Sequence, residues 1–122
     1  MSTLNVANIS DGTDTVETGY VVNGSAKAWC HWAGTSTIND SLNVSSITDH
    51  GTGDFTNTFT NAFDNSNYSY VGSVQNNPSV AAGVIVLFGQ AVGSFRTTTE
   101  QSNNFAAYDA GINCTQACGD LA

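Results

Sequence analysis

In the stretch Phe55-Thr-Asn-Thr-Phe-Thr-Asn-Ala-Phe63, every second residue is phenylalanine or asparagine. The residues between them are threonines, apart from one alanine. Successive side chains of a β-strand point to opposite faces, so a strand over this stretch places its phenylalanines and asparagines on one face and its threonines on the other. No segment of the chain carries the helical pattern of apolar residues at i, i+3, i+4 and i+7 flanked by capping residues. The stretch therefore predicts a strand and indicates a β-protein.

Comparable short segments recur along the chain and are separated by groups of turn-forming residues. One such group is Thr48-Asp-His-Gly-Thr-Gly-Asp54, in which Gly51 and Gly53 give the backbone access to positive φ angles. Short strands with turns at near-regular spacing are typical of antiparallel sandwiches. We therefore predict an all-β fold, an antiparallel β-sandwich of about seven strands, at residues 27–32, 38–47, 55–63, 68–74, 84–88, 91–99 and 106–118.

The N-terminal segment differs in character from the rest of the chain. Asp11-Gly-Thr-Asp14 and Gly19 interrupt every segment in which a strand could form there. We therefore predict an extended N-terminal arm or linker at residues 1–23, followed by a β-sandwich domain at residues 24–122.

The charge of the chain excludes several classes of partner. The formal net charge is -8, and Lys27 and Arg96 are the only strongly basic residues. Two cations cannot neutralise the several phosphates that a nucleic acid or an anionic lipid surface presents. The longest apolar stretch, residues 80–88, is too short for a membrane-spanning helix. The first residues do not have the pattern of a secretory signal, so we expect folding in a cytoplasm.

The apolar content is low for a protein that buries a core. Leu, Ile, Val and Phe supply 26 of the 122 residues, whereas Ser, Thr and Asn supply 42. Small and polar side chains therefore occupy many positions on the inner faces of the predicted strands. We expect a thin core whose missing contacts are supplied by identical neighbouring subunits.

Several motifs occur in a familiar order between residues 24 and 74. Gly24-Ser-Ala-Lys-Ala-Trp29 precedes Asp40-Ser-Leu-Asn-Val-Ser-Ser-Ile-Thr-Asp49, and Gly51-Thr-Gly-Asp-Phe55 and Asn67-Tyr68 follow. This order resembles a domain that recurs in tail-fibre and virion structural proteins of bacteriophages, particularly phages of marine bacteria and cyanobacteria. The resemblance implies a non-enzymatic, tail-fibre-like protein that is made in the host cytoplasm and projects from the virion. It also implies a homotrimer in contact with other virion structural proteins.

Two other functions remain open. The arm of a capsid decoration (cement) protein would bind the head shell, and the small single domain fits that role as well. A carbohydrate-binding module would recognise a host-surface glycan through aromatic rings that stack on sugars. The aromatic residues that could contact a sugar, or else pack in the core or a subunit interface, are Trp29, Trp32, Tyr68 and Tyr70.

We predict no catalytic, cofactor-binding or metal-binding residues. Cys30 and His31 are adjacent, so on a strand their side chains face apart and cannot act together as nucleophile and base. The acidic loops lack the spacing of an EF-hand. Cys114 and Cys118 lie about 13 Å apart if they share a strand, which is too far for a disulfide between them. We expect the three cysteines to be structural thiols, although disulfides within an assembled particle stay open.

Overall fold

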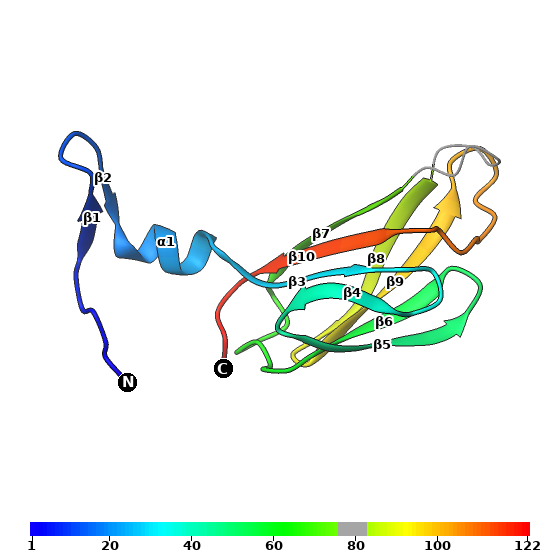
Figure 1. The fold of residues 1–122 in the computed structure, drawn as a ribbon, viewed down its shortest axis with the longest axis horizontal. Coiled ribbons are helices and arrows are strands. Elements are labelled where there is room, and N and C mark those ends of the chain that lie inside the picture. Colours follow the sequence, from blue (N-terminus) through cyan, green and yellow to red (C-terminus); the bar gives the residue numbers. More distant parts are fainter. Residues whose placement is uncertain (76–82) are drawn as a thin grey trace.

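The computed structural model describes residues 1–75 and 83–122, and strands dominate it (Figure 1). Two four-stranded antiparallel sheets face each other. The first, called here the β10 sheet, has the order β4 (Ile38–Leu42), β3 (Ala26–Trp32), β10 (Asn113–Cys118) and β7 (Ser69–Val74). The second, the β9 sheet, has the order β5 (Val44–Gly51), β6 (Asp54–Phe59), β9 (Ser94–Gln101) and β8 (Gly83–Ala91).

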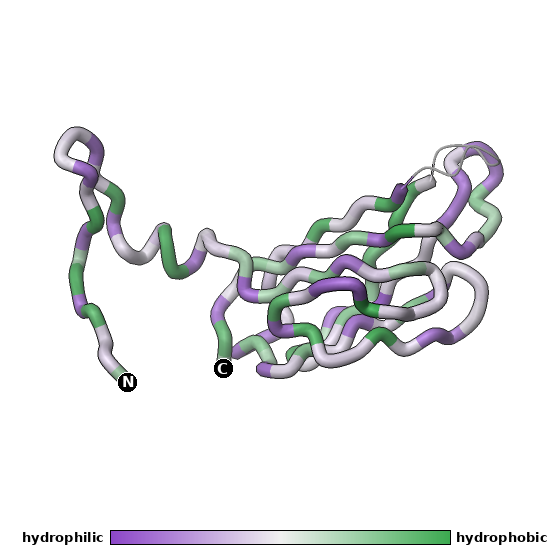
Figure 2. The backbone as a smooth tube through the Cα atoms, viewed as in Figure 1, coloured by the Kyte–Doolittle hydropathy of each residue, from purple (hydrophilic) through white to green (hydrophobic). Residues whose placement is uncertain are grey.

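The all-β, antiparallel sandwich predicted from the alternation is confirmed. Figure 2 shows hydrophobic and hydrophilic residues alternating along the strands. The described residues form ten strands and not about seven, because one predicted strand is divided in two and the N-terminal segment contributes a further pair. Residues 80–82 of the apolar stretch lie outside the described residues.

The predicted strand at residues 38–47 is wrong as a single element. The chain turns at Asn43, whose φ is 56°, and passes from β4 in one sheet to β5 in the other. Asparagine tolerates this left-handed conformation better than most residues. The Asn43 side chain also holds the corner, since its Oδ1 accepts from the Asn61 amide at 2.7 Å and its Nδ2 donates to the Asn61 carbonyl at 3.0 Å.

The N-terminal segment contains regular structure that the sequence did not predict. β1 (Asn8–Ser10) pairs with β2 (Thr15–Glu17), and α1 (Thr18–Gly24) follows. Of the residues expected to break every strand, Asp11-Gly-Thr-Asp14 forms the turn of this hairpin and Gly19 lies in α1. In the turn, Asp11 Oδ1 accepts from the amides of Thr13 and Asp14 at 2.9 Å each. The arm, residues 1–24, projects away from the two sheets (Figure 1).

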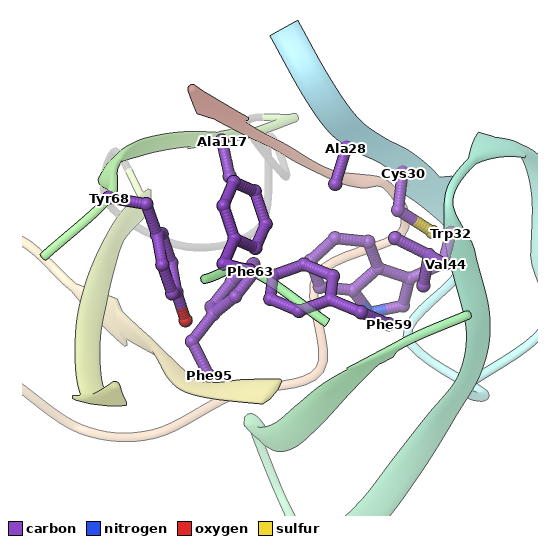
Figure 3. Close-up of a cluster of buried hydrophobic side chains, with 9 residues drawn as sticks. All are labelled: Ala28, Cys30, Trp32, Val44, Phe59, Phe63, Tyr68, Phe95 and Ala117. Atoms are coloured by element: carbon purple, nitrogen blue, oxygen red, sulfur yellow. The ribbon is translucent and has the colours of Figure 1, made fainter. Parts of the chain in front are cut away.

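A cluster of aromatic rings fills one part of the space between the sheets (Figure 3). Phe59 lies at its centre, with ring centroids 4.9 Å from Phe63, 5.6 Å from Tyr68 and 5.7 Å from Phe95. The inward face predicted for the stretch at residues 55–63 is confirmed at Phe55, at Asn57 and at Phe59, all buried. β6 ends there, however, so Asn61 is exposed and Phe63 reaches the cluster from a loop.

Hydrogen-bonded polar side chains fill another part of the interior. The Thr115 hydroxyl donates to Asn57 Oδ1 at 3.2 Å, which links β10 to β6 across the two sheets. The Thr99 hydroxyl donates to Asn113 Oδ1 at 3.1 Å in the same way. Asn57, Thr99 and Asn113 are completely buried. Buried polar groups are tolerated when they are paired, so these pairs take the place of aliphatic side chains in the core. The pairing of Asn57 is through its Oδ1 alone, since its Nδ2 has no hydrogen-bond partner among the described residues.

The pair between Asn57 and Thr115 predicts a non-additive effect of mutation. Thr115→Val leaves Asn57 Oδ1 buried without its donor, which should destabilise the protein by about 1 to 3 kcal/mol. Asn57→Val combined with Thr115→Val removes both partners, and its stability should return to within roughly 1 kcal/mol of the unmodified protein. Urea denaturation measures the free energies of unfolding. Thr58→Val, on the outer face of β6, is the control and should change stability by less than about 0.5 kcal/mol. A double variant less stable than Thr115→Val would contradict the pairing.

The tight turn between β5 and β6 predicts that Gly53 tolerates no side chain. Its φ is +69°, and an added Cβ would lie 2.6 Å from the Thr99 carbonyl oxygen and 2.8 Å from that of Tyr108. Both contacts are with backbone, which cannot move aside without disturbing β9. Gly53→Ala should therefore cost roughly 2 to 5 kcal/mol in the same denaturation assay. Gly93→Ala is the matched control, because a Cβ there meets nothing within 4 Å; equal losses in both variants would refute this account.

Candidate functional site

The four aromatic residues singled out from the sequence lie in different environments. Trp32 is fully buried, and Tyr68 is 5 % exposed with its hydroxyl donating to the carbonyls of Ala91 and Ser94. Tyr70 is half-buried and packs against the aromatic cluster. Trp29 is half-buried and belongs to the outward-facing positions of β3. Trp32 and Tyr68 are thus core residues with little or no exposed surface, and Trp29 remains as the outward-facing aromatic residue of the four.

Trp29 lines a groove on the outer face of the β10 sheet. The groove has a volume of about 390 Å³ and crosses β3, β10 and β7. It is open to solvent and more apolar than polar in its lining. We call it the sheet-face groove; the outward-facing side chains that line it are Trp29, His31, Val71, Ser73, Cys114 and Gln116.

Strand register places these side chains in two rows across the sheet. In the first row, Gln116 of β10 lies between Trp29 of β3 and Val71 of β7. In the second, Cys114 lies between His31 and Ser73. Directly opposed residues on one face have Cβ atoms about 4.5 to 5.5 Å apart, so the side chains of each row are immediate neighbours across the sheet.

The second row continues onto β4, where Asp40 lies opposite His31. Asp40, His31 and Cys114 are therefore successive neighbours in this row. Enzymes with a cysteine nucleophile use the same order of groups, in which an acidic residue orients a histidine base and the histidine activates the thiol. The prediction that Cys30 and His31 face apart agrees with the structure, since Cys30 is buried and His31 faces outward. Sequence analysis missed Cys114 as the neighbour of His31, because only the pairing of β3 with β10 brings them together.

The chemistry of this row does not favour nucleophilic attack by Cys114. Burial raises the pKa of the Cys114 thiol, which keeps it protonated near neutral pH. Among the hydrogen bonds of the described residues, none joins His31 to Cys114 or to Asp40. An activated cysteine needs a lowered pKa and a base within hydrogen-bond reach. The row thus places a protonated thiol, an imidazole and a hydroxyl at the floor of the groove, with the carboxylate of Asp40 at its end.

The remaining thiols and acidic groups form no recognisable centre in residues 1–75 and 83–122. All three cysteines are free, and Cys30 is buried with its pKa raised to about 12, chiefly by desolvation. No group of three His, Cys, Asp or Glu residues in the described part of the chain is arranged to hold a metal ion. None of the described helical residues forms a helix that is long and apolar enough to cross a bilayer.

Comparison of the chain with protein-family models, with curated proteins and with solved structures finds no match. The resemblance of residues 24–74 to bacteriophage fibre domains is therefore carried by the motifs in the sequence, and it stays a prediction.

The environments of the cysteines predict their reactivity with a thiol reagent. At pH 8 a thiol with a pKa of about 12 is almost entirely protonated, so Cys30 should not react with Ellman's reagent in the folded protein. Cys114 and Cys118 are partly exposed and should react, Cys114 more slowly than a free thiol because its pKa is raised. Cys30→Ala should leave the folded-state titration unchanged and remove one thiol after unfolding in urea. Rapid reaction of all three thiols in the folded protein would contradict the buried position of Cys30.

Proposed function

We propose that the protein is a non-enzymatic structural protein of a bacteriophage virion, tail-fibre-like, which assembles into a homotrimer through its N-terminal arm. The sequence motifs at residues 24–74 support the virion origin through their resemblance to fibre domains. The exposed apolar side chains of the arm support the assembly.

The arm is the observation that carries the proposal. Every residue from 1 to 24 except Thr18 is exposed, and α1 has no buried residue. The exposed side chains include large apolar ones, namely Leu4, Val6, Ile9, Val16, Tyr20, Val21 and Val22. An isolated helix of this length and an isolated two-stranded hairpin are marginal in water. The arm therefore needs a partner surface to stabilise its structure and to cover its apolar side chains.

The sandwich of another copy of the chain offers an exposed apolar surface that could cover the apolar side chains of the arm. β8 is an edge strand of the β9 sheet, and its outward positions Val84, Val86 and Phe88 are 38 %, 43 % and 39 % exposed. Natural proteins usually protect long apolar edge strands by charge or by covering them. Here Arg96, which pairs with Asp54, lies over the Phe88 ring at 5.6 Å from its centroid and covers part of the strand. A neighbouring subunit would cover the rest.

The net charge of the chain makes the stability of this assembly depend on salt. Each subunit carries a net charge of -8, so subunits repel one another at long range. Salt screens that repulsion and leaves apolar contacts intact. The assembly should therefore be more stable at 500 mM than at 50 mM NaCl.

An alternative location on the particle is supported by the same arm. A capsid decoration protein would insert residues 1–24 into the head shell instead of docking them on the sandwich of a neighbouring copy. Gold labelling of intact particles with an antibody against the sandwich distinguishes the tail from the head.

The proposal predicts a trimer that depends on the apolar face of the arm. Mass photometry and sedimentation equilibrium at micromolar concentration should give three times the chain mass of 12.7 kDa. Val21→Asp with Val22→Asp should lower the association constant by at least about tenfold, since two buried charges cost more than 1.4 kcal/mol. Thr13→Asp places a charge in the hairpin turn of the same arm and serves as the control. A stable folded monomer of the unmodified chain would overturn the proposal.

A further inference from the structure

We propose that the sheet-face groove binds an uncharged carbohydrate, with one sugar ring stacked on the indole of Trp29. This inference concerns the β10 sheet and not the arm, so it goes beyond the assembly role and does not depend on it.

The apolar part of the groove suits the C–H face of a sugar. Trp29 stands on the outer face of the sheet, whereas the neighbouring Trp32 on the same strand is fully buried. Val71, 60 % exposed, borders the groove on the far side of Gln116. A tryptophan combines a large apolar face with a polar N–H edge, which suits ligands that are apolar on one side and polar on the other. Sugars have this character.

The polar part of the groove supplies both donors and acceptors, as hydroxyl groups require. Gln116 is exposed between Trp29 and Val71, and its Nε2 makes only a weak 3.8 Å contact with Cys118 Sγ. Its amide therefore has an acceptor and a further donor to offer. Ser73 and His31 add a hydroxyl and a ring nitrogen at the other row of the groove. A few such polar groups around an aromatic floor are typical of small-ligand sites.

The charges around the groove favour a neutral ligand over an acidic one. Lys27 lies on the outward face of β3, two residues from Trp29, but its ammonium donates to Ser25 Oγ at 2.7 Å and to the Val22 carbonyl, at the end of α1. Asp40 lies beside His31 at the end of the second row, and the whole chain carries a net charge of -8. An anionic glycan would be repelled by this field. The volume of about 390 Å³ lies near the lower end for ligand sites and matches one or two sugar rings.

The test uses the full chain on an array that carries neutral and sialylated glycans. Neutral glycans should bind, and titration with lactose, maltose and N,N′-diacetylchitobiose, followed by ¹H–¹⁵N NMR, should shift the amide signals of β3, β10 and β7 for the sugar that fits best. Trp29→Ala should weaken that binding at least tenfold, and Gln116→Ala should weaken it by a smaller factor. Trp29→Tyr keeps an aromatic face and should retain part of the affinity.

Controls separate ligand binding from folding and from assembly. The groove variants Trp29→Ala, Trp29→Tyr and Gln116→Ala must keep the thermal unfolding profile and the mass of the unmodified protein. Tyr20→Ala changes an aromatic residue of the arm and should leave binding by each subunit unchanged, even if the oligomer weakens. The inference is overturned if no neutral glycan binds, if Trp29→Ala binds as well as the unmodified chain, or if only acidic glycans bind. It is also overturned if Trp29→Ala dissociates the oligomer, because the groove is then a contact between subunits.

Discussion

The register of β10 between β3 and β7 is the constraint on which both faces of the sandwich depend. The Thr115 hydroxyl donates to Asn57 inside the protein, and this contact with the opposite sheet ties β10 to one register. A slip by one residue would turn Thr115 outward and bring Cys114 and Gln116 into the core. The same register places Gln116 beside Trp29 on the outer face. The buried hydrogen bonds of Thr115 and Asn113 to the opposite sheet therefore favour one register, and that register forms the interior and the floor of the groove together.

The composition of the interior explains how a chain with few aliphatic residues encloses a core. Aromatic rings around Phe59 supply the apolar contacts in one part, and threonine–asparagine pairs fill another. The low aliphatic content is thus balanced within the chain, so it is a weaker argument for neighbouring subunits than it first appears from composition. The arm gives the better reason to expect neighbouring subunits, because its helix and hairpin expose apolar side chains that nothing in the described chain covers.

The two proposals assign different surfaces to different tasks. Assembly uses the arm and the outward face of β8, which belongs to the β9 sheet. Carbohydrate binding uses the outer face of the β10 sheet, where the half-buried Trp29 faces outward. A trimer would present three such grooves, and linked weak sites bind a multivalent surface far more strongly than one site binds a free sugar. Assembly through the arm and β8 would in this way increase the avidity of the β10 sheet for such a surface.

The sequence by itself determined the class of fold and most strand positions, because the alternation in stretches such as residues 55–59 is a local property of neighbouring side chains. It also determined that Cys30 and His31 face apart. It did not reveal the corner at Asn43, since a single left-handed residue leaves the alternation on either side intact. Nor could it place Cys114 beside His31 or distinguish the buried Trp32 from the outward Trp29 as a ligand contact. Those features depend on which strands pair and in which register, and only contacts between residues distant in the sequence decide that.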